Sequence, residues 1–230
     1  MFYDLHVHTS LSIGENTVEE VVEMAKKIGL DGIGIVRYHP ELVTIPKDND
    51  IDIVDAVMVK AESAEELNEI VRRMRNRAEI IMVHGGNYDV NRAACENSMV
   101  DILCHPELGR RDSGLDHIAV KAAKQNDVMI EINFREILES HTKQRSYVLS
   151  SLKRNVMLCN KYDVKMITCS GAVSKWNMRS CRDMASIAHL LGLELGEAIN
   201  TVSNNAKEAV ERNRNKMQKG DVKGVDTLGA

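Results

Sequence analysis

The feature that most restricts the fold of this chain is a regular alternation of short apolar runs with helical patterns. Helix starts are recognisable at Thr17 and Ser63, each of which is followed three residues later by a glutamate, as in a capping box. Between the helices we predict strands at residues 2–6, 32–37, 56–61, 79–85, 100–105, 128–134 and 165–172. This alternation predicts a parallel sheet, and about seven units in 230 residues favour a TIM-barrel-like α/β barrel over a doubly wound sheet.

Composition and motifs exclude several other classes of protein. No Gly-x-Gly-x-x-Gly follows any predicted strand, so a dinucleotide-binding fold has no support. The five cysteines form no Cys-x-x-Cys pair and are expected to be buried thiols. No apolar run approaches the roughly 18 residues of a membrane span, and Asp4 and His6 interrupt the N-terminus where a secretory signal is apolar. We therefore expect a cytoplasmic protein with no membrane partner.

The domain organisation is expected to be simple, because no repeat or linker divides the chain. Residues 1–212 are predicted to form one barrel domain. Residues 213–230 are polar and contain glycines without a period, which predicts a flexible tail. Asp48, Asp50 and Asp52 resemble the start of a calcium loop but lack its turn glycine and its final glutamate, so we interpret them as a solvated acidic loop.

Asp4, His6 and His8 occupy alternate positions of the first predicted strand, so their side chains should leave the same face. A buried carboxylate or imidazole needs a partner, and three such groups on one face are typical of a metal or phosphate site. The alternative is a pair of histidines that are simply exposed or hydrogen-bonded, which is the more frequent outcome for a lone His-x-His.

Further polar residues fall where later strands end. His84 ends the fourth predicted strand, His105 ends the fifth, and Glu131 lies on the sixth. The carboxyl ends of barrel strands meet on one rim, where barrel enzymes build their active sites. We therefore predict a single rim site, formed by Asp4, His6, His8, His84, His105 and Glu131.

These motifs resemble known families at two levels. The opening Asp-Leu-His-Val-His of residues 4–8, with the later histidines, resembles the polymerase-and-histidinol-phosphatase (PHP) superfamily, whose barrels bind a cluster of metal ions. A narrower resemblance covers residues 2 to about 210. Its motifs are VHGGN at 83–87, NRAACE at 91–96, VDILCHP at 100–106 and ITCSGA at 167–172, followed by Trp176, Arg179 and Asp183. On these motifs the chain is similar to the archaeal ribonuclease P protein component 3 family, which is related to the eukaryotic thirty-kilodalton subunit.

The chain departs from the metal-binding pattern of the PHP superfamily. The superfamily's last ligand strand carries Asp-x-His after a serine, whereas here Ser170 is followed by Gly171, Ala172 and Val173. Residues 38–40 read Tyr-His-Pro, which keeps an imidazole but lacks the expected carboxylate. Because hydrolytic metal catalysis depends on a fixed coordination geometry, we expect a vestigial rim site with no catalytic residue and assign no metal to it. Whether the surviving histidines still bind a metal or a phosphate stays open from the sequence.

The narrower resemblance implies a protein subunit of ribonuclease P, the ribonucleoprotein whose RNA removes the 5′ leader of precursor tRNA. It implies no cofactor for the chain itself and magnesium for the RNA-based reaction. The implied partners are ribonuclease P RNA, ribonuclease P protein component 2 and, through the complex, precursor tRNA. We select as candidates for contact with RNA or the protein partner Arg92, Arg111, Lys121, Arg145, Arg179 and Arg182. Each could instead form an intramolecular ion pair, as Arg92 would with Glu96.

Two other functions remain open from the sequence. The rim histidines and Glu131 could hold metal and activate water in an autonomous phosphoesterase, or the barrel could bind a phosphate or nucleotide without chemistry. Gly171 and Val173 favour the subunit over the phosphoesterase. A net charge of −4 provides little long-range attraction to RNA, so we expect RNA contact to be local and to depend on a partner.

Overall fold

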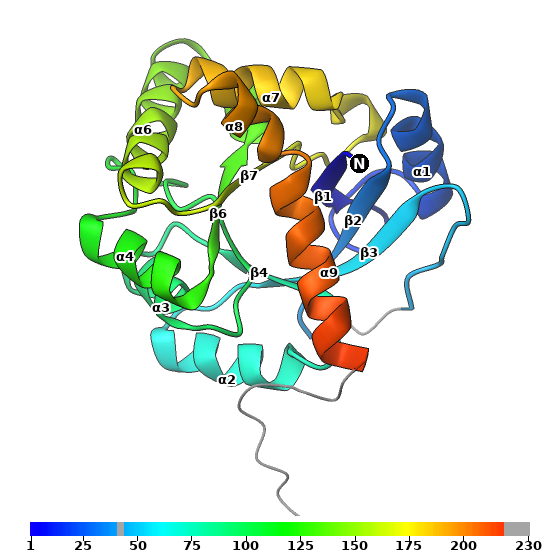
Figure 1. Cartoon of the computed structure of the whole chain (residues 1–230), viewed down its shortest axis with the longest axis horizontal. Helices are drawn as coiled ribbons and strands as arrows, with labels where there is room; N and C mark the ends of the chain where they lie inside the picture. Colours follow the sequence, from blue (N-terminus) through cyan, green and yellow to red (C-terminus); the bar gives the residue numbers. More distant parts are fainter. Residues whose placement is uncertain (41–43, 219–230) are drawn as a thin grey trace, which may run out of the picture.

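The computed structural model describes residues 1–40 and 44–218 and contains a seven-stranded parallel sheet in the order β1-β2-β3-β4-β5-β6-β7 (Figure 1). The strands are β1 (Tyr3–His8), β2 (Gly32–Tyr38), β3 (Asp52–Val59), β4 (Ile80–His84), β5 (Ile102–Cys104), β6 (Met129–Asn133) and β7 (Met166–Cys169). All seven predicted strands are confirmed. The main difference is that β3 begins at Asp52 rather than at residue 56.

The sheet closes almost completely into a barrel. Beyond the end of β7, Val7 and Ala172 form a parallel bridge, and the His8 amide donates to the Ala172 carbonyl at 2.8 Å. The register of β1 against β2 shifts between Asp4 and Val7, which marks an irregularity in the strand that carries the N-terminal motif. The predicted TIM-barrel-like fold is therefore confirmed.

Helices surround the barrel (Figure 1). They are α1 (Val18–Lys27), α2 (Ala64–Met74), α3 (Tyr88–Glu96), α4 (His117–Asn126), α5 (Phe134–Glu139), α6 (Thr142–Lys161), η1 (Lys175–Asn177), α7 (Cys181–Leu190), α8 (Leu195–Asn200) and α9 (Asn204–Gln218). The capping box at Thr17 is complete. At Ser63 only half of the box forms, because the Glu66 carboxylate accepts from the Glu62 amide at 2.8 Å instead of from Ser63.

The last helix, α9, closes the end of the barrel opposite the rim. Ala206, Ala209 and Val210 of α9 pack against the apolar cluster inside the barrel, which includes Met82 and Ile102. Each Å² of apolar surface that is buried stabilises a fold by about 25 cal/mol, so this packing holds α9 on the barrel. Helix α9 therefore covers the N-terminal ends of the strands, at the opposite end of the barrel from the carboxyl-end rim.

Ion pairs fasten α9 to the strand starts. Arg214 donates to both Asp52 oxygens at 2.8 Å and to Glu79 at 2.6 Å. The expected tail boundary at residue 213 is therefore wrong for residues 213–218, which are helical, while residues 219–230 lie outside the described residues. Asp52 likewise belongs to β3 rather than to a solvated loop, whereas Asp48 and Asp50 pair with Lys26.

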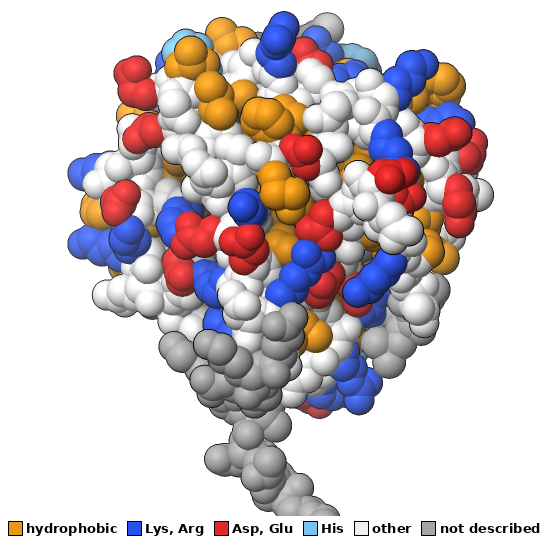
Figure 2. Space-filling model, turned by 45° about the vertical axis from the view of Figure 1, so that its right-hand side comes forward, with side chains coloured by type: hydrophobic (Ala, Val, Ile, Leu, Met, Phe, Trp, Pro, Cys, Tyr) orange, Lys and Arg blue, Asp and Glu red, His pale blue; other side chains and the backbone are white. Residues whose placement is uncertain are grey.

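Acidic and basic side chains are interspersed over the face shown in Figure 2. Among the described residues of that face, side chains of one charge do not gather into one large patch. The five cysteines are all free and buried, as expected. None of the described helices is both long and apolar enough to cross a membrane.

Candidate functional site

The four strand-end histidines lie on one rim of the barrel, which confirms the predicted geometry. The ring centroids of His6 and His8 are 5.0 Å apart, and those of His6 and His105 are 5.2 Å apart. The ring centroids of His84 and His105 are also 5.2 Å apart. Parallel strands bring their carboxyl ends together, so β1, β4 and β5 deliver these imidazoles to one place although up to about a hundred residues separate them.

A chain of hydrogen bonds runs through this cluster and ends at a carboxylate. His6 Nδ1 lies 2.6 Å from Glu131 Oε1, and His6 Nε2 lies 3.1 Å from His8 Nε2. His8 Nδ1 is in turn 3.2 Å from the Ser12 hydroxyl. Because an ionised Glu131 can only accept, His6 Nδ1 donates to it. The four residues therefore form one connected network.

The charge states in the cluster follow from burial. Burial lowers the pKa of His8 to about 2 and that of His105 to about 3. Burial opposes ionisation of Glu131, but the neighbouring His6 and His105 and hydrogen bonds from His6 and Asn133 outweigh it and lower the pKa of Glu131 to about 2. At neutral pH the site thus holds an ionised carboxylate beside neutral imidazoles at His8 and His105.

Asp4 does not belong to the group of described residues whose ligand atoms converge at the rim. Its Oδ1 accepts from the Ser170 amide at 3.1 Å and from the His6 amide at 3.3 Å, so it joins β1 to the end of β7. Its other oxygen, Oδ2, has no hydrogen-bond partner among the described residues. Burial raises the pKa of Asp4 to about 6. We conclude that Asp4 stabilises the strand ends behind the histidines.

Three side chains of the rim could hold a metal ion. Ligand atoms of His6, His105 and Glu131 lie within 4.8 Å of one another, and all three residues are buried. His105 Nδ1 and Glu131 Oε2 have no hydrogen-bond partner in the described structure, and they lie 3.7 Å apart. Two imidazoles and a carboxylate are a donor set that suits zinc, with one coordination position left open. These residues therefore fit a single divalent cation.

The ligands that a metal cluster would require are absent from the last strand end. Gly171 has φ +62°, and a Cβ at this position would lie 2.6 Å from Asn133 Oδ1 and 2.7 Å from Asn133 Nδ2. Asn133 is itself fixed, because its Oδ1 accepts from the Arg135 amide at 2.9 Å. The Asn133 amide thus fills the space in which a larger residue at 171 would begin.

Two acidic residues near the rim were not identified from the sequence. Glu107 is buried with both carboxylate oxygens unpartnered by described residues, and burial raises its pKa to about 8. Glu136 Oε1 lies 3.7 Å from His105 Nδ1, and burial raises the pKa of Glu136 as well. The alternation of His105 and Glu107 resembles that of His6 and His8, and this spacing was the available signal.

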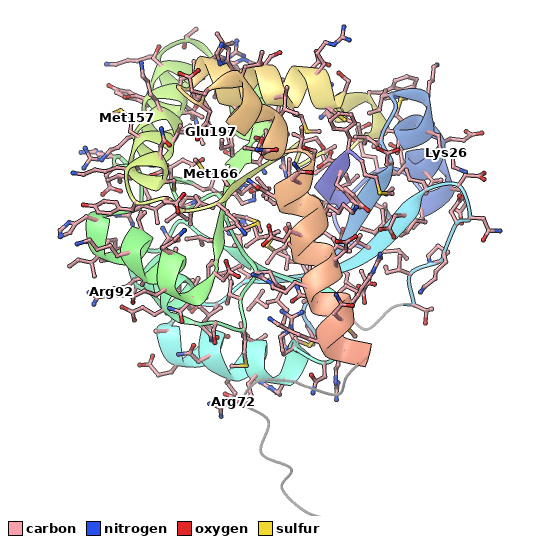
Figure 3. All side chains as sticks on the ribbon, viewed as in Figure 1. Lys26, Arg72, Arg92, Met157, Met166 and Glu197 are labelled. Atoms are coloured by element: carbon pink, nitrogen blue, oxygen red, sulfur yellow. The ribbon has the colours of Figure 1, made fainter. Side chains whose placement is uncertain are left out.

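The six candidate cations are not gathered at the rim but are distributed over several elements. Arg92 pairs with Glu96 at 2.8 Å, as the alternative interpretation expected, and points outward from α3 in Figure 3. Lys121 lies 5.3 Å from the Tyr162 ring centroid. Arg145 donates to the Ser140 carbonyl at 2.8 Å.

Arg179 and Arg182 lie close together in sequence but differ in their contacts. Arg179 donates to the carbonyls of Trp176 and Met178 and lies 5.3 Å from the Phe134 ring centroid. It does not pair with Asp183, whose carboxylate accepts from the Ser180 hydroxyl at 2.7 Å. The side chains of Arg182 and of Arg111 form no hydrogen bond or ion pair with any described residue. None of these contacts tests a role in RNA binding.

Comparison with known sequences gives consistent matches over almost the whole chain. The family model described as RNase P subunit p30 matches residues 1–218. Ribonuclease P protein component 3 of Methanosarcina barkeri (strain Fusaro / DSM 804) is 34% identical over 217 residues, which cover 93% of this chain and 90% of the relative. The protein of the same name from Methanococcoides burtonii is 36% identical over 215 residues, which cover 93% and 88%.

Comparison with solved structures extends this likeness to three dimensions. A chain in the cryo-EM structure of archaeal ribonuclease P with mature tRNA matches with a TM-score of 0.77 and 27% identity, covering 98% of each chain. Histidinol phosphate phosphatase from Lactococcus lactis, complexed with zinc, L-histidinol and phosphate, matches with a TM-score of 0.56 and 10% identity, covering 84% of this chain and 94% of the phosphatase. At that identity the second match shows a shared fold and nothing more.

Proposed function

The chain belongs to the RNase P subunit p30 family, and from this membership we propose that it is a protein subunit of ribonuclease P that acts in the 5′ maturation of tRNA. The observation that carries the proposal is the combination of two matches over nearly the full length. Relatives named ribonuclease P protein component 3 cover 93% of the chain, and a chain of archaeal ribonuclease P with mature tRNA covers 98% of it. The narrower resemblance drawn from the motifs is thereby confirmed.

In this proposal the chain contributes binding and the RNA contributes the chemistry. The observation that supports a non-catalytic chain is the rim, where His6, His105 and Glu131 converge but Asn133 occupies the space beside Gly171. A metal cluster needs every ligand held in a fixed geometry, and Gly171 and Val173 stand where two of its ligands would lie, so the described rim offers one group of ligands, for a single cation. Magnesium would be required by the RNA and not by this chain.

The proposed partners follow from the same match. The related chain lies in an archaeal ribonuclease P with tRNA, which supports ribonuclease P RNA and tRNA as partners of this chain. Ribonuclease P protein component 2 is the protein partner we propose, and a cytoplasmic location is part of the proposal. With a net charge of −4 the chain should bind RNA weakly alone and firmly only in the assembly.

The test is a reconstitution with and without the chain. Ribonuclease P RNA and the remaining protein subunits are assembled, and precursor tRNA cleavage is followed as magnesium is lowered. Proteins that offset phosphate repulsion let the RNA fold and bind substrate at lower magnesium, so the complete assembly should keep its activity where the assembly without the chain loses it. Equal cleavage with and without the chain would contradict the proposal, as would cleavage by the chain in the absence of RNA.

One observation favours a second function, an autonomous PHP-type phosphoesterase. His6, His105 and Glu131 present three ligand atoms within 4.8 Å, and a zinc-bound phosphatase shares the fold. This function would require metal-dependent turnover by the isolated chain. The missing carboxylate and imidazole at Gly171 and Val173 weigh against it.

A further inference from the structure

A groove of about 630 Å³ lies on the outside of the barrel, between the loop before α4 and the outer face of α6. Arg111 lines it from the loop, and Ser150, Lys153, Arg154 and Met157 line it from α6. Figure 3 shows Met157 on the outer side of α6. None of the rim histidines lines the groove, so it is a separate feature of the surface.

The groove carries an excess of positive charge, because its lining has three cations and two carboxylates. Arg111, Lys153 and Arg154 are exposed, and the side chain of none of them forms a hydrogen bond or an ion pair with a described residue. Arg154 comes near enough to Asp112 to contribute to the lowered pKa of that carboxyl, although the hydrogen bond from Arg110 is the larger cause. The three cations therefore keep their donors free for an external acceptor.

The carboxylates of the groove are already occupied. Asp112 accepts from Arg110 Nε at 2.7 Å, from Arg110 Nη2 at 2.9 Å and from the Gly114 amide at 2.8 Å. Asp116 caps α4, where it accepts from the amides of Ile118 and Ala119, and it also accepts from the Tyr88 hydroxyl at 2.8 Å. Arg110 neutralises Asp112, and Asp116 accepts from neutral donors only, so the three cations of the lining outnumber its two carboxylates.

Buried amides hold the two walls of the groove in place. Asn155 of α6 donates to the Ser113 carbonyl at 2.9 Å, and Asn91 of α3 donates to the Gly114 carbonyl at 2.9 Å. Gly114 has φ +71°, and a Cβ there would lie 1.8 Å from the Pro106 carbonyl oxygen, so the loop has one tightly fitted path. A groove whose walls are fixed before binding loses little conformational entropy when a ligand enters.

We infer that this groove binds the phosphate backbone of an RNA segment, an inference that rests on the proposed function. Guanidinium groups match phosphate oxygens with paired hydrogen bonds, and the hydroxyls of Ser150 and Ser151 are further donors on the same wall. Tyr88, the aromatic residue of the lining, already has Arg110 positioned 5.9 Å from its ring centroid. The groove therefore suits contacts to phosphates rather than stacking with bases.

A site-specific cross-link tests the position of the RNA. All five native cysteines are buried, so a cysteine in Ser150→Cys would be the thiol that an aryl azide reagent labels in the folded protein. After assembly with ribonuclease P RNA and the remaining subunits, irradiation should join the chain to RNA. A cross-link to a protein subunit would show that the groove holds an acidic protein segment, and no cross-link in an active assembly would show that the groove is open. Either result would overturn the inference.

A charge variant provides a second measurement. The triple variant Arg111→Gln, Lys153→Gln, Arg154→Gln is compared with Arg73→Gln, Lys124→Gln, Lys207→Gln, in which each cation pairs with a surface carboxylate. The quantity measured is K, the binding constant of the chain for ribonuclease P RNA assembled with the remaining subunits. Each lost phosphate contact should make the plot of log K against log salt less steep by about 0.7 to 0.9. The slope should therefore be about 2 to 3 smaller in magnitude for the groove variant and unchanged for the control. An unchanged slope for the groove variant would refute the inference.

The two proposals fail in different ways. If omission of the chain leaves precursor tRNA cleavage unchanged, the subunit role fails and the groove loses its ligand. If omission abolishes the gain in activity at low magnesium but the groove variant matches the control, then the subunit role stands and only the groove is wrong. Equal melting temperatures of the two triple variants exclude a difference in folding.

Discussion

His6 and Glu131, which are 125 residues apart in the chain, meet inside the barrel with His6 Nδ1 2.6 Å from Glu131 Oε1. Both side chains are buried, with exposed fractions of 1% and 0%. A buried carboxylate beside a donor is stable only while the donor remains, because a lone buried charge has no solvent to compensate it. The rim therefore depends on this pair for stability whether or not it retains a ligand.

Glu131→Gln should lower the free energy of unfolding at pH 6 by about 2 to 4 kcal/mol, because a charge-assisted bond in the interior is lost. The pKa of Glu131 is lowered to about 2 in the folded protein, so its contribution is present above about pH 4.5 and is lost as pH falls toward 2. We would measure the free energy of unfolding with urea, in EDTA, across this pH range. It should fall less steeply toward low pH in the variant than in the parent. Glu23→Gln, at an exposed position, serves as the control. The same dependence of unfolding free energy on pH in both variants would contradict the prediction.

Glu107 should give stability a pH dependence opposite to that of Glu131. Burial raises its folded pKa to about 8, so its contribution to stability is full below about pH 4.5 and declines as pH rises to 8. Glu107→Gln should remove this decline and make the protein more stable than the parent at pH 8.5. Thermal unfolding with EDTA at pH 5 and pH 8.5 measures it, with exposed Glu65→Gln as the control. A parent and variant that lose stability equally between these pH values would disprove the effect.

Gly171 should tolerate a side chain poorly, since a Cβ would lie 2.6 Å from Asn133 Oδ1 in addition to the strain of φ +62°. We expect Gly171→Ala to lower the free energy of unfolding by about 2 to 4 kcal/mol. Gly109 has a similar positive φ, at +70°, but nothing lies within 4 Å of a Cβ there. Gly109→Ala therefore isolates the cost of the backbone, and its loss of stability should be the smaller. Asn133→Ala in the Gly171→Ala background should recover part of the loss if the clash is its cause.

Arg214 anchors α9 to two strand starts through Asp52 and Glu79, and its exposed fraction is 31%. Arg214→Ala should reduce the free energy of unfolding by about 1 to 3 kcal/mol, because two partly buried carboxylates lose their donor. Lys207→Ala on the same helix removes an exposed pair with Glu211 and should cost less than about 0.5 kcal/mol. Urea unfolding compares the two, and equal losses would show that the Arg214 pairs add no stability.

Part of this structure could be predicted from the sequence because it depends on local patterns. The seven strands follow from apolar runs, and the common rim of His6, His84 and His105 follows from the rule that parallel strands end together. The contact of Arg214 with Asp52 joins residues 162 apart, and no local pattern identifies it. The sequence around a charged residue next to a strand looks the same whether the residue is solvated or paired. Asp52 was therefore wrongly assigned to a solvated loop, although it begins β3.

The fine structure of the site was beyond the sequence for a similar reason. The loss of ligands at Gly171 and Val173 was visible, but the sequence did not show that Asn133 fills the space beside Gly171. Burial of Glu107 depends on how the loop after β5 packs, and sequence spacing alone does not determine that packing. Roles for the six candidate cations could not be assigned either, since Arg92 with its partner Glu96 and Arg111 without one have the same appearance in a sequence.

The isolated chain should have no substantial metal-dependent phosphatase activity. His6, His105 and Glu131 fit a single cation, but Gly171 and Val173 stand where two further ligands of a metal cluster would lie, and the Asn133 amide fills the space beside Gly171. The measurement is hydrolysis of a generic phosphomonoester with manganese or zinc added, with His8→Ala and Glu23→Gln as paired variants. Binding of one zinc ion without turnover would agree with the prediction. Multiple turnovers that His8→Ala abolishes and Glu23→Gln leaves intact would contradict it and would establish the phosphoesterase function instead.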